Sequence, residues 1–206
     1  MTESIEAEKK RLRSLMRGEL GRRLQGDLRE RAARNAASRL FELPAYRRAG
    51  ALLSYLPLPL EADTTPVNTR TLLDGKLLCL PRITGPGRLE ICPVDPARSI
   101  PSQTAPGALG VAEPLGPALS LEDLAGRLSP ERGLLVLAPG LAFSLGGGRL
   151  GRGGGYYDRL IPRLRAASLG RFGLWVAGFC FDFQVVPALP MDAWDAPVDF
   201  VLTGRT

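Results

Sequence analysis

The sequence predicts one α/β domain over residues 1–206, with three α/β/α layers, a mostly parallel central sheet and N-terminal helices. Three observations support this fold class. Apolar runs alternate with amphipathic segments along most of the chain. The candidate strands are apolar throughout, as in parallel sheets that are buried on both faces. A chain of 206 residues is also long enough for one sizeable core, and it shows no internal repeat and no clear linker.

The first 48 residues are helical in pattern. Apolar residues near helical spacing predict a helix over 4–24 and a second over 27–42, which ends before Pro44. The continuous apolar run at 50–58 follows a glycine and predicts a buried strand.

Strands and helices then alternate to the end of the chain. Thr65 is expected to cap the next helix, and Pro66 to occupy its first position. A helix is also expected to start within 154–157, and the Pro-, Gly- and Ser-rich segment 95–120 is expected to be a long loop. The remaining strand candidates are 76–81, 88–94, 133–140, 174–180 and 198–204.

Composition excludes several kinds of site. The chain has no histidine, which removes Ser-His-Asp and Cys-His nucleophile systems and every His-based zinc site. A metal would have to be a hard ion held by carboxylates, with magnesium the first choice. Three scattered cysteines, Cys79, Cys92 and Cys180, are expected to be reduced core residues. With no long apolar segment and no apolar leader, we expect a cytoplasmic protein without a membrane partner.

The positive charge is confined to one segment. Residues 1–48 hold 13 Lys and Arg against 7 Asp and Glu, whereas the remainder holds 14 of each. A nucleic-acid surface is one interpretation. Because the acidic residues are interspersed and few aromatic residues accompany the basic ones, a solvated helix face with a few phosphate-binding cations is favoured.

The most distinctive stretch is "LGGGRLGRGGGYYDRL" at 145–160. Gly146, Gly148 and Gly151 match the dinucleotide fingerprint after a strand, but the acidic residue expected about 20 positions later is missing. The P-loop pattern also fails, because no Lys-Ser or Lys-Thr follows. An Arg-Gly nucleic-acid tail is disfavoured as well, because the stretch is short and lies between a strand and a helix.

The physical requirements of a phosphate cradle are nevertheless present. Glycines let backbone N–H groups approach an anion, and a following helix N-terminus adds partial positive charge. Arg149 and Arg152 bring guanidinium groups suited to phosphate oxygens, and Asp158 is placed to hold magnesium on them. In the alternative, Asp158 only complements its helix N-terminus, and the glycines form a tight turn. The residues favour phosphate binding.

The segment "LVLAPGLAFSLGGGRLGRGGGYYDRLI" closely resembles the signature of the 5-formyltetrahydrofolate cyclo-ligase family. Further blocks match in the same order over nearly the whole chain. They are Lys9 with Arg13, "YLPLPLEADT", "GVAEP" and "FDFQVVPALPMDAWDAPVDFVLT".

This resemblance implies an ATP- and Mg-dependent cyclisation of 5-formyltetrahydrofolate to 5,10-methenyltetrahydrofolate, with release of ADP and phosphate. The formyl oxygen would be phosphorylated, and the folate N10 would then attack the activated carbon. The implied partners are ATP and 5-formyltetrahydrofolate, with or without a polyglutamate tail. We expect a monomer that binds no nucleic acid.

The resemblance also assigns roles to residues. Catalysis is assigned to Arg149, Arg152 and Tyr156. ATP binding is assigned to Lys9, Arg13, Arg149, Leu150, Gly151, Arg152, Gly153, Gly154, Gly155, Tyr156 and Tyr157. Folate binding is assigned to Tyr55, Leu56, Glu61, Arg152, Gly153, Gly154, Gly155 and Tyr156. The metal is assigned to Asp158 and Asp195. Lys9 and Arg13, four residues apart, share one helix face. Glu61 suits the pterin amino group and ring N–H because a carboxylate only accepts hydrogen bonds.

Two positions depart from the family pattern. Ser144 stands where the family usually has Asp, and Trp194 stands where it usually has His, directly before Asp195. The departures fit a tuned enzyme or a relative with another acyl substrate. Two alternative functions remain. One is a non-catalytic relative that binds folate or nucleotide, and the other, suggested by the N-terminal charge, is a nucleic-acid-binding protein.

Overall fold

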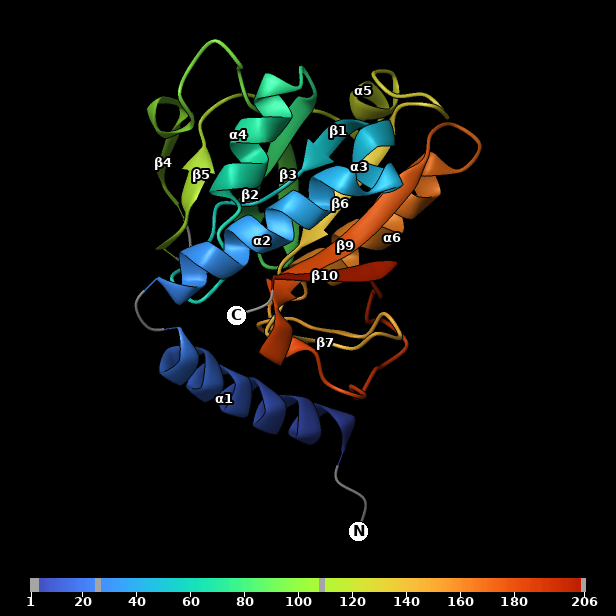
Figure 1. The fold of residues 1–206 in the computed structure, drawn as a ribbon. Coiled ribbons are helices and arrows are strands. Elements are labelled where there is room, and N and C mark those ends of the chain that lie inside the picture. Colours follow the sequence, from blue (N-terminus) through green and yellow to red (C-terminus); the bar gives the residue numbers. More distant parts are fainter. Residues whose placement is uncertain (1–3, 25–26, 108–109, 205–206) are drawn as a thin grey trace.

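Six strands form the central sheet of the structure, a computed structural model that describes residues 4–24, 27–107 and 110–204 (Figure 1). They are β1 (Ala49–Leu53), β2 (Leu77–Gly85), β3 (Arg88–Pro93), β6 (Gly133–Ala138), β9 (Leu174–Phe181) and β10 (Phe200–Gly204). Their order is β10-β9-β6-β1-β2-β3, and every neighbouring pair is parallel except the β2–β3 hairpin. The predicted fold class is confirmed.

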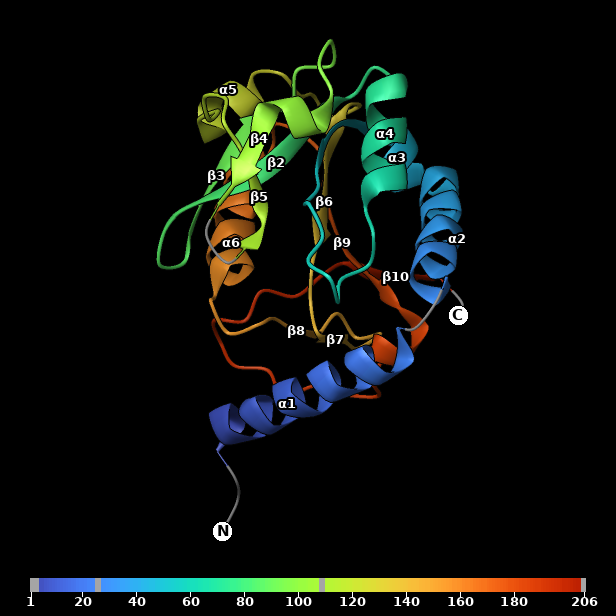
Figure 2. The ribbon, with the colours of Figure 1, turned by 90° about the vertical axis from the view of Figure 1, so that its left-hand side faces the viewer.

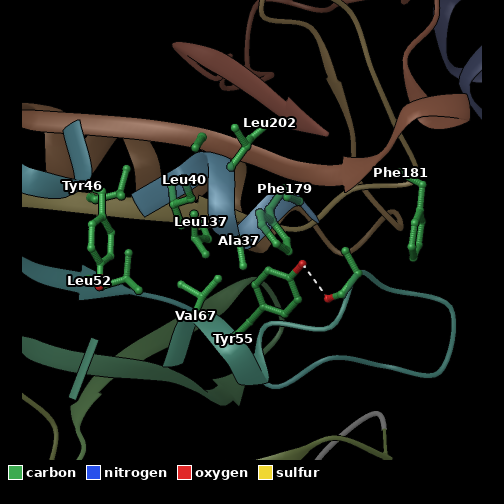
Figure 3. Packing of buried hydrophobic residues seen from close by; sticks show 14 of the residues in the cluster. Ala37, Leu40, Tyr46, Leu52, Tyr55, Val67, Leu137, Phe179, Phe181 and Leu202 are labelled. Carbon is green, nitrogen blue, oxygen red and sulfur yellow. Dashed lines mark hydrogen bonds between the residues drawn. The ribbon is translucent and has the colours of Figure 1, made fainter. Parts of the chain in front are cut away.

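Helices cover both faces of this sheet, as Figure 2 shows with the sheet nearly edge-on. One face carries α2 (Leu28–Glu42), α3 (Pro44–Arg48) and α4 (Thr65–Leu73). The other carries α5 (Leu121–Ala125) and α6 (Tyr156–Ser168). Each face has its own apolar cluster. In the first, Leu40 of α2 and Val67 of α4 pack with sheet residues such as Leu137 (Figure 3). The three cysteines are buried and free, as predicted.

The chain leaves the sheet earlier than predicted after β1. The strand expected over 50–58 ends at Leu53, and the following segment becomes a loop. Pro57 and Pro59 lack the N–H that a further ladder would need. The next helix is capped at Thr64 rather than Thr65, and Thr64 Oγ1 donates to the Tyr55 carbonyl at 2.5 Å. The loop is thereby fixed against the start of α4.

The predicted long loop over 95–120 contains regular structure. It holds the 3-10 turn η1 (Ile100–Gln103) and a hairpin of β4 (Thr104–Pro106) and β5 (Ala112–Pro114). Arg82 of β2 fixes this hairpin by donating to the carbonyls of Pro114 at 3.1 Å and Gly116 at 2.8 Å. Strands of three residues that contain proline give little periodic signal, so they could not be predicted from the sequence.

Helix α1 (Ile5–Arg23) lies apart from the two helical layers, across the carboxyl-terminal side of the sheet (Figure 2). A small hairpin of β7 (Ala142–Phe143) and β8 (Arg149–Leu150) lies between α1 and the sheet. Met16 and Leu20 are the buried apolar residues of α1. Among the described residues, no helix combines the length and apolarity needed to cross a membrane.

Candidate active site

The sheet changes winding direction between β1 and β6. From β1 the chain moves outward to β2 and β3, and it then returns to β6 on the other side of β1. In open α/β sheets, ligands bind in the crevice outside the carboxyl ends of two such strands. The segments that follow β1 and β6 both contribute to a cavity of about 520 Å³. Residues from β2, β3 and β5 complete its walls.

The glycine stretch is divided between two structures, and its first half, residues 146–148, forms a hairpin turn. The Ser144 hydroxyl accepts from the Gly148 N–H at 3.0 Å, and the Ser144 N–H donates to the Gly148 carbonyl at 2.9 Å. Gly147 has a φ of 89°, and a Cβ there would come 2.6 Å from the Val198 carbonyl oxygen. This turn closes β7 onto β8. The fingerprint match therefore spans two unrelated substructures.

The second half of the stretch, residues 151–155, forms part of the cavity wall. Gly151, Gly154 and Gly155 line the cavity, and Gly155, with a φ of 65°, is the N-cap of α6. Since Gly155 has no side chain to cap the helix, the first amides of α6 are left for water or a ligand. A helix start of this kind at a cavity favours an anion.

Two arginines flank these glycines. Arg149 is only 5% exposed, and it donates to Asp158 Oδ1 at 2.5 Å and to the Pro139 carbonyl at 3.3 Å. Arg152 Nε donates to Glu61 Oε1 at 2.9 Å. Each arginine therefore connects the glycine segment to another wall of the cavity.

Unpartnered polar atoms are concentrated at this cavity. Among the described residues, six buried side-chain nitrogen or oxygen atoms have no hydrogen-bond partner, and four of them belong to residues that line it. These four are Glu113 Oε1, Arg149 Nε, Arg152 Nη2 and Tyr157 Oη. Burial raises the pKa of the Tyr157 hydroxyl well above its usual value, so it remains a protonated donor. Since such atoms are costly in a folded protein, their clustering indicates a ligand site.

The two carboxylates predicted to hold metal lie on segments that contact each other. Asp158 Oδ1 accepts from the Ala196 N–H at 3.2 Å, which brings the neighbouring Asp195 to the start of α6. Asp195 pairs with Lys9 and accepts from the Asp192 N–H at 2.6 Å. Within the described ranges, no group of three or more potential ligands surrounds a metal position. Two carboxylates fit magnesium, which keeps several waters and binds substrate phosphates.

Helix α1 presents cations to the second half of the stretch. Lys9 is 5% exposed, so it is not part of a solvated helix face. Arg13 Nε donates to the Gly151 carbonyl at 3.2 Å, and Arg17 Nη2 donates to the Arg152 carbonyl at 3.3 Å. One face of α1 thus holds the backbone of the segment in place.

The residues predicted to bind folate line the same cavity. Tyr55 is buried and donates its hydroxyl to the Ala62 carbonyl at 3.3 Å (Figure 3). Glu61 has both oxygens engaged, Oε1 by Arg152 and Oε2 by the Leu58 N–H at 3.0 Å. The Arg152–Glu61 pair therefore lies where the predicted phosphate and folate regions meet.

Most of the predicted site residues come together. The cavity is lined by Tyr55, Leu56, Glu61, Arg149, Gly151, Arg152, Gly154, Gly155, Tyr156, Tyr157 and Asp158. Lys9, Arg13 and Asp195 lie beside it and are joined by the contacts above. Leu150 packs its side chain in the core, and Gly153, with a φ of 109°, lies at the surface. Trp194 is 75% exposed.

Sequence reasoning missed two parts of the wall. One is the apolar side provided by the β2–β3 hairpin, namely Leu80, Pro81, Ile83 and Leu89. Strand residues of this type carry no signal for binding. The other is Glu113, which belongs to the "GVAEP" motif. That motif is the sequence signal that could have located Glu113.

The fold and the cavity define an α/β protein in which a helix start without a side-chain cap lines a cavity at the switch point of the sheet. A family model described as the 5-formyltetrahydrofolate cyclo-ligase family matches residues 5–204. The chain therefore belongs to this family of enzymes.

Relatives and solved structures agree with the family. The chain is 28% identical to a Schizosaccharomyces pombe protein named probable 5-formyltetrahydrofolate cyclo-ligase, covering 95% of this chain and 94% of the relative. It is 28% identical to the Escherichia coli K12 5-formyltetrahydrofolate cyclo-ligase, covering 88% and 93%. The Aquifex aeolicus 5,10-methenyltetrahydrofolate synthetase structure has a TM-score of 0.68 at 33% identity, covering 94% and 88%. A Mycoplasma pneumoniae synthetase structure, at 15% identity and a TM-score of 0.66, supports the fold alone and covers 95% and 98%.

Proposed function

We propose that this protein catalyses the ATP- and Mg-dependent closure of 5-formyltetrahydrofolate to 5,10-methenyltetrahydrofolate, with release of ADP and phosphate. The observation that supports this most is that one cavity contains both a glycine-lined helix start and an apolar pocket. Donors of Arg149, Arg152 and Tyr157 that have no partner among the described residues belong to the same cavity. A site for phosphate beside a site for a flat heterocycle is what the reaction requires.

The chemistry explains why phosphoryl transfer is needed. A formamide oxygen is a poor leaving group, so it first attacks the γ-phosphorus of ATP, and the bond to ADP breaks. The N10 nitrogen then attacks the activated formyl carbon and loses its proton. The phosphorylated oxygen finally departs as phosphate with the electrons of its C–O bond. The protein's task is to align the reactants and to stabilise charge.

The proposed phosphate site consists of the second half of the glycine stretch and its cations. Arg149 and Arg152 each have a buried guanidinium nitrogen without a partner in the described structure. These nitrogens are suited to the equatorial oxygens of the transferred group. The first amides of α6 add donors in the same region. Lys9 and Arg13 are proposed to contact the phosphates from α1.

Asp158 and Asp195 are proposed to hold magnesium together with phosphate oxygens. In the described structure each carboxylate is neutralised by a cation, Asp158 by Arg149 and Asp195 by Lys9. A divalent ion at this position would neutralise the negative charge that develops on the phosphates. Asp158 and Asp195 would then bind the metal, and Arg149 and Lys9 would bind the phosphates.

The folate is proposed to occupy the apolar part of the cavity. Leu56, Leu80 and Ile83 contribute apolar side chains to its lining, and Tyr156 lines the same cavity directly after the glycine segment. The ring of Tyr156 lies so close to Gly154 that a Cβ at that glycine would come 2.4 Å from it. A glycine is therefore needed at this position to seat the aromatic ring.

The N-terminal cations support small-molecule partners over nucleic acid. Several pair along their own helices, as Arg23 does with Glu19 at 2.9 Å and Arg31 with Asp27 at 3.3 Å. Others contact the glycine segment. We propose that the protein is a monomer and that its partners are ATP and folate.

The proposal is tested by mixing the protein with Mg-ATP and 5-formyltetrahydrofolate. The expected result is the absorbance of the methenyl product, with one ADP formed for each product molecule. A binding protein without activity would retain both ligands and form neither product. No methenyl product at saturating concentrations of both substrates would overturn the proposal.

A further inference from the structure

We propose that Glu113 determines folate specificity by accepting a hydrogen bond from an N–H donor of the reduced pterin. This inference rests on the proposed function and adds a residue from another wall of the cavity. Glu113 lies on β5, in a hairpin where it is directly opposite Ala105 of β4. It lines the cavity together with Val111 and Ala112.

The side chain of Glu113 is held along its hairpin. It packs so closely on Gly107 that a Cβ there would come 2.5 Å from Glu113 Oε2. The backbone that follows is fixed by Arg82, which donates to the carbonyls of Pro114 and Gly116. A carboxylate placed by a paired strand and a fixed backbone is preorganised for binding.

Glu113 has an open acceptor. Its Oε1 atom is buried, and within the described residues it has no hydrogen-bond partner. A carboxylate with a purely structural role is normally paired, as Glu90 is with Arg82 through two bonds of 3.1 and 2.7 Å. The hydrogen bond to Glu90 is the main cause that raises the pKa of Arg82, and the charge of Glu113 adds least; the Arg82 guanidinium donates to Glu90 and to the two carbonyls. The unpaired oxygen is therefore left for a ligand.

Glu61, another carboxylate that lines the cavity, is already engaged. Both oxygens of Glu61 already accept hydrogen bonds, from Arg152 and from the Leu58 amide. A reduced pterin carries N–H donors, and an ionised carboxylate can only accept. A site with a buried acceptor also rejects molecules that lack the donor, because the acceptor then remains unpaired. Glu113 is thus suited to select the folate heterocycle.

The test is Glu113→Gln, which keeps the shape of the side chain and removes its charge. The Kd for 5-formyltetrahydrofolate, measured without nucleotide, should rise about 10- to 100-fold. The KM for folate should rise more than kcat falls, and the Kd for a non-hydrolysable Mg-ATP analogue should stay unchanged. The melting temperature should be equal or higher, because a buried unpaired charge has been removed. Glu122→Gln, in an exposed pair with Arg171, is the matched control and should change neither Kd.

The other possible outcomes separate the role of Glu113 from the proposed function. An unchanged folate Kd in a folded Glu113→Gln protein would overturn the inference and leave the proposed function intact. Equal losses of folate and nucleotide binding with a lower melting temperature would assign Glu113 a structural role and also overturn it. Glu113→Ala gives a second test and should weaken folate binding at least as much as Gln. Failure of the wild-type protein to bind 5-formyltetrahydrofolate would instead overturn the proposed function.

Discussion

The two halves of the glycine stretch have nearly the same composition and different physical roles. Gly146–Gly148 form the turn of the β7–β8 hairpin, where their backbone is paired with Ser144 and Val198. Gly151–Gly155 lead into the uncapped start of α6 beside the cavity. The comparison teaches that glycine content alone does not locate a binding site. What distinguishes the halves is whether the nearby polar groups are already satisfied.

The arginine of the second half should show the largest effect. We expect Arg152→Ala to lower kcat/KM about 1,000-fold, because it removes a charged donor from the phosphate region and leaves Glu61 without its partner. Steady-state kinetics with both substrates would measure this. Arg163→Ala, on the exposed side of α6, is the control. Near-normal turnover of Arg152→Ala would remove the proposed distinction between the halves.

The carboxylate at the start of α6 should show the next largest effect. Asp158→Asn is expected to lower kcat about 100-fold and to raise the Mg²⁺ concentration needed for half-maximal rate. Titration of the activity with Mg²⁺ in wild type and variant would measure the shift, and a chelator should abolish the activity of both. An unchanged Mg²⁺ requirement would show that Asp158 only complements the helix N-terminus.

A change in the first half should affect stability instead of turnover. Gly147→Ala should lower the free energy of unfolding by about 2–3 kcal/mol, because it combines a positive φ with a close contact to Val198. Denaturant unfolding measures this. Gly146→Ala is the matched control, since a Cβ added at Gly146 would meet no atom within 4 Å. Loss of turnover in correctly folded Gly147→Ala would contradict the purely structural role of the first half.

The smallest expected effect is at Ser144. Removal of its hydroxyl takes one hydrogen bond from the Gly148 N–H, so Ser144→Ala should cost about 1 kcal/mol of stability. Turnover of the folded variant should match that of the wild type. A large loss of turnover would show that this position contributes to the cavity despite its place in the hairpin.

The sequence predicted the fold class, and most of the residues that it assigned to the site line one cavity. Continuous apolar runs located the buried strands, and the pattern after β6 located the glycine segment and α6. The position of Lys9 and Arg13 on one face of α1 also followed from their spacing. These features depend on local periodicity and local chemistry, which a single sequence records.

Other features could not be predicted from periodicity. The apolar run after Leu53 does not show where the strand ends, and the strands of the β4–β5 hairpin are only three residues long. The ion pair between Arg152 and Glu61 depends on a tertiary contact, since these residues lie 91 positions apart. The "GVAEP" motif marks Glu113 in the sequence, but only the described structure shows that its Oε1 atom is buried and has no hydrogen-bond partner there.

The central claim is that phosphate binds to the second half of the glycine stretch and not to the first. It is tested most directly by ¹⁵N labelling of glycine alone and by following the backbone amide resonances as Mg-ATP is added. The resonances of Gly151, Gly153, Gly154 and Gly155 should shift, and those of Gly146–Gly148 should not. Shifts confined to Gly146–Gly148, or no shift in either half at saturating Mg-ATP, would contradict the claim.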